Sequence, residues 1–139
     1  MKYVDASAVL RVLFGEAGPA VPLLDGDRVV SSHILEVETF RAVDRARLVG
    51  QLDDRQTAVK RKELADLLAM LDLAPVDQVV IGRAKGSFGI NVRALDAIHV
   101  ATAEVLADES GEPLEFWTHD DRQAAAALSR GVTVKGAAD

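Results

Sequence analysis

Four short segments of the chain each place a carboxylate among small or apolar residues: Val4-Asp5-Ala6-Ser7, Glu36-Val37-Glu38, Ala94-Leu95-Asp96-Ala97-Ile98 and Thr118-His119-Asp120-Asp121. If the four segments meet in the fold, their charges repel, by roughly 4 kcal/mol for two charges about 4 Å apart at an effective dielectric constant near 20. A domain that is stable by only about 5–15 kcal/mol does not tolerate several such pairs without a cation or bound protons. The pattern therefore favours a site for a divalent cation.

The residue types also restrict the kind of cation. The sequence has no cysteine and only three histidines, so oxygen atoms would supply the ligands. Carboxylate oxygens favour Mg²⁺ or Mn²⁺ over zinc, and Mg²⁺ commonly completes its coordination with water and substrate phosphates. The formal net charge of −6 argues against binding of a polyanion through bulk electrostatics. A bound metal would therefore have to supply the attraction for a nucleic acid.

Asp96 is the most informative of these acids. It lies in a segment, Ala94 to Ala103, that is so apolar that its helix must be largely buried. Burial of an isolated carboxylate is costly unless the group is paired, protonated or bound to a metal. The alternative is that Asp96 only interacts with the N-terminus of its own helix, where aspartate is favoured.

Two of the segments contain two acids, and in each we expect one acid to face the site. Glu38 lies on the apolar side of its predicted helix, whereas Glu36 lies about 200° around the axis and is expected to face solvent. Asp120 is the site candidate of the last segment, and Asp121 is expected to cap the following helix or to lie at the rim. Asp5, at the end of a strand, has turn formation as its alternative role.

The elements that would position these acids alternate between short β-prone runs and longer helical runs. We expect strands over residues 2–4, 29–30, 73–76, 116–118 and 132–134, and helices over 7–14, 34–48, 53 or 54–71, 77–85, 94–107 and 122–128, with Ser31 or Ser32 as the N-cap of the second helix. Strands separated by helices predict right-handed crossovers and a mostly parallel sheet covered on both faces. The fold class is therefore α/β. Asp5 and Asp120 would follow strands at the carboxyl edge of the sheet, where such folds form their sites.

Length and composition predict one soluble domain over residues 1–139. Hydrophobic residues make up 49% and charged residues 27%, which is ordinary for a globular protein. Apolar runs are far shorter than the roughly 20 residues of a membrane span. Asp5 interrupts the N-terminus before an apolar signal-peptide region could form, and cysteine is absent, so we expect a cytoplasmic protein with no membrane association.

The four acidic motifs, in this order and spacing, resemble those of PIN-domain ribonucleases of the VapC type, the toxins of bacterial toxin–antitoxin pairs. The resemblance rests on residues 1–8, 31–42, 95–103 and 117–120, and it extends over nearly the whole chain. It implies a Rossmann-like, three-layer α/β/α sandwich and an endoribonuclease that depends on Mg²⁺, for which Mn²⁺ would substitute. It also implies structured RNA such as tRNA or rRNA as substrate, an antitoxin protein as partner, and a homodimer.

The resemblance also implies a role for each residue of the motifs. Asp5 and Asp96 would bind the metal most directly, with Asp120 in the same metal shell and Glu38 acting there or through a water. Ser7 and Thr118 would support the carboxylates by hydrogen bonds. A metal-activated water would attack the phosphorus in line. His99 is expected to be a core residue or to contact the acids, and His33 and His119 to lie at the rim or surface.

Four arginines lie near the motifs in sequence and are candidates to contact the RNA backbone: Arg11, Arg41, Arg45 and Arg93. Ordinary solvated charges are the other interpretation of each. Two other classes of protein stay open. A phosphoaspartate receiver or phosphohydrolase also has an Asp at a strand end. Its phosphatase form needs a second Asp where this chain has Ser7, whereas a receiver needs a lysine at the end of its last strand, and Lys135 lies roughly there. The second class is a non-catalytic α/β binding module.

Overall fold

A computed structural model describes residues 1–137 of the chain, so the predicted domain of residues 1–139 includes two positions outside the described residues. Its strands are β1 (Lys2–Val4), β2 (Val29–Ser32), β3 (Asp72–Ala74), β4 (Glu115–Trp117) and β5 (Thr133–Lys135). Its helices are α1 (Ala6–Phe14), α2 (Ile34–Leu48), α3 (Asp54–Leu68), α4 (Gln78–Ala84), α5 (Ala94–Ser110) and α6 (Asp121–Ser129). The strands form one sheet in the order β3-β2-β1-β4-β5, and every neighbouring pair is parallel.

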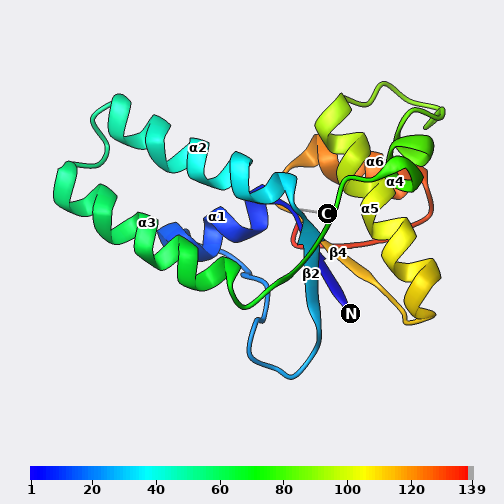
Figure 1. Ribbon diagram of the computed structural model, residues 1–139, viewed down its shortest axis with the longest axis horizontal. Coiled ribbons are helices and arrows are strands. Elements are labelled where there is room, and N and C mark those ends of the chain that lie inside the picture. Colours follow the sequence, from blue (N-terminus) through cyan, green and yellow to red (C-terminus); the bar gives the residue numbers. More distant parts are fainter. Residues whose placement is uncertain (138–139) are drawn as a thin grey trace.

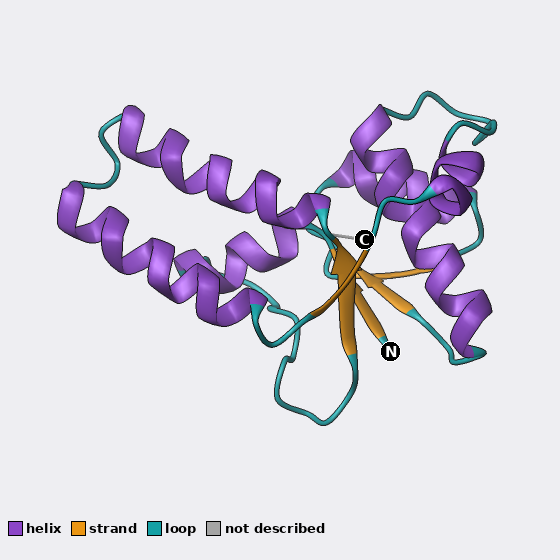
Figure 2. Ribbon diagram, in the orientation of Figure 1, coloured by secondary structure: helices purple, strands orange, loops and turns teal. Residues whose placement is uncertain are grey.

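Helices cover both faces of this sheet, which confirms the predicted three-layer α/β/α class (Figures 1 and 2). Successive side chains of a strand point to opposite faces. In β1, Val4 packs into a core with α1, α2 and α3, whereas Tyr3 packs into a second core with α5 and α6. The sheet is thus buried from both sides, as is usual for parallel strands.

The strand order reverses at the centre of the sheet. From β1 the chain adds β2 and then β3 on one side, and it returns to pair β4 with β1 and β5 with β4 on the other side. In open parallel sheets, a reversal of this kind opens a crevice at the carboxyl ends of the two central strands. Here those strands are β1 and β4.

Aspartate side chains cap several of the helices. Asp53 forms a capping box with Gln56 at the start of α3, and Asp77 caps α4. Both serines that were predicted to cap α2 extend β2 and pair with β3. Helix α2 follows His33, which makes no side-chain capping bond, but the Ser32 hydroxyl accepts a hydrogen bond of 3.3 Å from the Ile34 amide in the first turn, so the prediction is confirmed in part.

Several boundaries differ from the predicted ones by a few residues. Helix α5 continues past the predicted end at residue 107 and runs to Ser110. It ends there because Gly111 adopts a left-handed conformation, with a φ of 68°. Strands β4 and β5 are each displaced by one residue from the predicted ranges. Helix α5 is the longest helix at 17 residues, and within residues 1–137 no helix has the length and apolar character needed to cross a membrane.

Candidate active site

Asp5 lies at the carboxyl end of β1 and is almost completely buried, with 4% of its surface exposed. Its Oδ1 accepts hydrogen bonds from the Ser7 hydroxyl (2.7 Å) and the Ala8 amide (3.0 Å), so Asp5 caps α1. Its Oδ2 accepts a hydrogen bond of 2.5 Å from the hydroxyl of Thr118, which follows β4. The two central strands are therefore joined through this carboxylate, and Ser7 and Thr118 support it as predicted.

Burial raises the pKa of Asp5, and the hydrogen bonds from Thr118, Ser7 and Ala8 oppose that rise. The three donors stabilise the charged form of a carboxylate that the surrounding protein desolvates. Thr118 is itself fully buried, and its Oγ1 also accepts a hydrogen bond from the Asp120 amide (3.0 Å). Thr118 thus links two of the predicted site acids.

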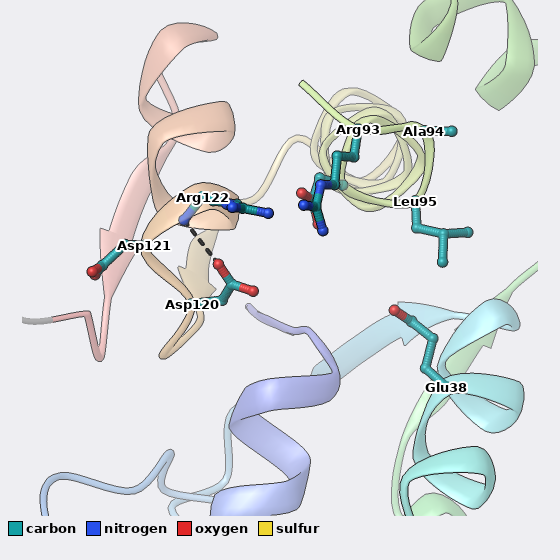
Figure 3. Close-up of a pocket in the computed structure, with 8 residues that line it drawn as sticks. Glu38, Arg93, Ala94, Leu95, Asp120, Asp121 and Arg122 are labelled. Atoms are coloured by element: carbon teal, nitrogen blue, oxygen red, sulfur yellow. Dashed lines mark hydrogen bonds between the residues drawn. The ribbon is translucent and has the colours of Figure 1, made fainter. Parts of the chain in front are cut away.

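A cavity of about 570 Å³ opens beside this edge of the sheet (Figure 3). Three of the four predicted acids line it, from three different helices or their caps: Glu38 of α2, Asp96 of α5 and Asp120 before α6. Its other lining residues are Arg93, Ala94, Leu95, Asp121 and Arg122. Asp5 does not line the cavity.

Asp96 is half-buried in the first turn of α5. Its pKa is raised, first by desolvation and then by repulsion from Asp120, Asp5 and Glu38, while His99 acts in the opposite direction. The other three predicted acids are therefore close enough to Asp96 to raise its pKa. Asp96 lines the cavity, and no hydrogen bond to its carboxylate is present within residues 1–137.

Asp120, not Asp121, is the N-cap of α6, because its Oδ1 accepts hydrogen bonds from the amides of Arg122 (2.8 Å) and Gln123 (3.3 Å). The prediction that Asp121 is the capping member of this pair is therefore corrected. Asp121 is exposed and lies at the rim, directed away from Glu38 (Figure 3). Asp120 has both roles that the sequence suggested separately, since it caps a helix and lines the cavity.

Glu38 reaches the cavity from α2, and its Oε1 lies 2.6 Å from Nε2 of His99. His99 is almost completely buried, and its Nδ1 lies 2.7 Å from the hydroxyl of Tyr3. Sequence reasoning placed His99 in the core or near the acids, which the structure confirms, but it did not identify Tyr3 as a member of the site. The position of Tyr3, two residues before Asp5 on the same strand, was the available signal. Glu36 is exposed, as predicted, and contacts His33 at the surface.

Of the four arginines predicted near the RNA, only Arg93 lines the cavity. Arg11 donates to the Ala17 carbonyl at 2.6 Å, and Arg41 pairs with Asp44. Arg45 lines a different cavity, between α1 and α2. Arg122 was missed by sequence reasoning and lies across the cavity from Glu38, on the side where Arg93 also extends (Figure 3).

The donor types at this site fit a hard divalent cation. The carboxylates of Asp5, Glu38 and Asp120 repel that of Asp96, and a bound cation would reduce this repulsion. The spacing is wider than a coordination shell, because no group of three histidine, aspartate or glutamate side chains in the described part of the chain is close enough together to hold an ion. The site thus offers suitable oxygen ligands around an open cavity.

Comparisons with known proteins identify the family of this chain. The family model of the PIN domain matches residues 2–129. The chain is 34% identical over 140 residues to ribonuclease VapC46 of Mycobacterium tuberculosis, covering 95% of this chain and 94% of that protein. It is 30% identical to ribonuclease VapC47 of the same species, covering 88% of this chain and 86% of that protein.

A solved structure has the same fold. It is a member of the VapBC family of toxin–antitoxin systems, VapBC-5 of Mycobacterium tuberculosis, with a TM-score of 0.55 at 22% identity over 96% of this chain and 94% of that one. The chain described here belongs to the PIN-domain family, and within it to the VapC proteins, as its four motifs predict. Lys135, which a receiver domain would need at its site, is exposed and does not line the acidic cavity.

Proposed function

We propose that this protein is a Mg²⁺-dependent endoribonuclease and the toxin of a toxin–antitoxin pair. The observation that carries the proposal is the cavity at the reversal of the strand order, lined by Glu38, Asp96 and Asp120. Its acids lie in a PIN-domain chain whose relatives include proteins named ribonucleases. We further propose structured RNA, such as tRNA or rRNA, as the substrate.

Asp5, Asp96 and Asp120 would hold the metal ion, with Glu38 beside it. A bound Mg²⁺ supplies positive charge to the phosphate and makes a water acidic enough to attack at neutral pH. The raised pKa of Asp96 means that it competes for a proton when the site holds no cation, so loading and protonation of the site oppose each other. Ser7 and Thr118 keep Asp5 oriented through the hydrogen bonds described above.

The protein's own cations would bind the RNA backbone beside the scissile phosphate. Arg93 and Arg122 both line the acidic cavity, and both also line an adjoining hollow of about 280 Å³. A guanidinium group donates in a fork that matches the geometry of a phosphate. These two arginines supply local positive charge in a chain whose net charge is −6.

Attack by an activated water predicts products with 5′-phosphate and 3′-hydroxyl ends. The test is to map the ends of cleaved RNA by their susceptibility to a 5′-phosphate-dependent exonuclease. A majority of 2′,3′-cyclic phosphate ends would instead mean that the ribose hydroxyl is the nucleophile.

An antitoxin is the partner we propose, and the surface between α1 and α2 is its candidate docking area. Leu10 and Phe14 of α1 and Val49 after α2 line a cavity of about 420 Å³ there, and Val49 is 65% exposed. We also propose a homodimer, which light scattering of the purified protein tests directly.

The main experiment measures cleavage of total bacterial RNA by the purified protein with Mg²⁺, Mn²⁺ or EDTA. We expect discrete fragments that require the metal and disappear in Asp96→Asn. Glu38→Gln and Glu36→Gln form a matched pair, because both remove one negative charge from α2 but only Glu38 lines the cavity. A lower rate of cleavage in Glu38→Gln with full activity in Glu36→Gln supports the site. Equal activity of all these variants, or cleavage that persists in EDTA, would reject it.

A further inference from the structure

The buried pair Tyr3 and His99 has no part in the mechanism described so far, although it contacts one of the site acids. Tyr3 belongs to β1, His99 to α5 and Glu38 to α2, so three elements meet in one chain of hydrogen bonds. Tyr3 is fully buried and His99 is 1% exposed, whereas the side chain of Glu38 is 22% exposed at the wall of the cavity. This series of hydrogen bonds therefore runs from the core to the site.

The chemistry of the three groups fixes the direction of the hydrogen bonds at the Glu38 end. An ionised carboxylate only accepts hydrogen bonds, so the hydrogen between Glu38 and His99 is carried by Nε2 of the imidazole. When His99 is neutral, its Nδ1 has a free lone pair and must accept from the Tyr3 hydroxyl. Burial raises the pKa of Tyr3, so its phenol keeps the proton that it donates.

Packing holds the two donors in place. The ring of Tyr3 stacks on Phe116 of β4 with 4.9 Å between centroids, and it meets the His99 ring edge-on at 5.7 Å. Side chains in a close-packed core occupy defined rotamers, and both rings are buried. Glu38, by contrast, is a long side chain on a half-exposed surface, and within residues 1–137 His99 is its only hydrogen-bond partner.

We propose that Tyr3 and His99 position Glu38: Tyr3 holds the orientation of the His99 ring, and His99 Nε2–H holds the Glu38 carboxylate at the cavity wall. This inference rests on the proposed nuclease site, of which Glu38 is a member. His99 and Tyr3 are positioning residues, because neither lines the cavity that would receive the substrate. Within residues 1–137, Glu38 is the only site acid that forms a hydrogen bond with His99, so their effect on catalysis is expected to pass mainly through Glu38.

A double-mutant cycle tests that dependence. Removal of a residue that orients a metal ligand through a hydrogen bond typically lowers metal affinity or activity by about 10- to 100-fold. We expect His99→Leu to lower kcat by about that factor with little change in KM, and Tyr3→Phe to lower it less, because it keeps the ring packing. His99→Gln returns an N–H donor and should recover part of the loss.

The decisive comparison is made in the Glu38→Ala background, where kcat is already reduced and His99 has no side-chain acceptor to hold at this position. If His99 acts through Glu38, adding His99→Leu or Tyr3→Phe there lowers kcat no further. A further loss equal to that seen in the wild-type background would overturn the proposal, because it would mean that the pair acts on the site by another route. Thermal unfolding of each variant identifies losses that come from unfolding alone.

A second measurement does not require cleavage, so it separates failure of this inference from failure of the proposed function. ¹⁵N-detected spectra of the histidine rings report which nitrogen carries the hydrogen, with His99→Gln used to assign the resonance. We expect His99 to carry it at Nε2 in the wild-type protein and in Tyr3→Phe, because Glu38 accepts from it in both. A wild-type ring with hydrogen only at Nδ1 would overturn the proposal even if the protein cleaves RNA, because that ring could not donate to Glu38.

Discussion

Replacement of Thr118 by valine removes one hydroxyl from the centre of the site without changing the shape of the side chain. The hydroxyl donates to Oδ2 of the buried Asp5 and accepts from the Asp120 amide. A hydrogen bond to a charged group contributes about 1.5–3 kcal/mol, and the Asp120 amide would also lose a partner. We therefore expect Thr118→Val to lower the free energy of unfolding by about 2–3 kcal/mol at neutral pH. For a chain of this length that is a fall in Tm of about 6–10 °C.

The loss of stability in Thr118→Val should be larger at neutral pH than in acid. Burial already places the folded-state pKa of Asp5 above its unfolded value, so folding loses stability as pH rises through the folded pKa. Thr118 opposes this rise, and its removal raises the pKa of Asp5 further. The loss in the variant is therefore largest where Asp5 is ionised. It should shrink to about 1 kcal/mol in acid, where the lost bond joins two neutral groups.

Urea unfolding of the metal-free protein at several pH values measures this dependence, with Thr118→Ser as the matched control. Thr118→Ser keeps the hydroxyl and removes one buried methyl group, which costs about 1 kcal/mol at every pH. If Thr118→Val loses the same stability as Thr118→Ser, or loses the same amount in acid as at neutral pH, the Asp5–Thr118 hydrogen bond does not have the role assigned to it.

Three further perturbations follow from the same structure. Asp96→Asn removes a carboxylate whose pKa is raised by burial and by neighbouring acids, so the metal-free protein should become more stable at neutral pH. The expected gain is on the order of 1 kcal/mol after solvent screening of this half-exposed group, and it should vanish in acid. Urea unfolding at two pH values measures both. Asp120→Ala should lose about 1 kcal/mol more stability than Asp120→Asn, because asparagine still caps α6, whereas both should lose cleavage; equal stability would contradict the capping role. Asp53→Ala breaks the capping box of α3 far from the cavity, and should cost about 1 kcal/mol in thermal unfolding while cleavage by the folded protein is unchanged.

The order of strands and helices was predictable because the apolar periodicity and the caps agree with each other. Asp53 and Asp77, for example, stand directly before helical runs and do cap them. Element ends were less predictable. Ser32 accepts a hydrogen bond from the Ile34 amide at the start of α2, as a capping residue does, yet its pairing with β3 also keeps it in the strand. Tertiary pairing therefore moved the strand end beyond the predicted residue.

The acids of the site were predictable from their positions after strands and on buried helix faces. Their partners were not, because the contacts that select them join distant parts of the chain. Tyr3 and His99 are 96 residues apart, and nothing in the sequence near either one reports the other. Arg122 and Arg41 look equally suitable for phosphate in sequence, but only the packing of α6 beside α5 brings Arg122 to the cavity.

The double roles of Asp5 and Asp120 have a consequence for reading related sequences. Each caps a helix, so a descendant that no longer cleaved RNA would still be under pressure to keep both acids, or asparagine in their place, in order to fold. Asp96 and Glu38 cap nothing, and the mutual repulsion that raises the pKa of Asp96 makes it a burden once catalysis is lost. Decay of the enzyme should therefore begin at Asp96 and Glu38, and a relative that keeps only Asp5 and Asp120 has preserved its fold rather than its chemistry.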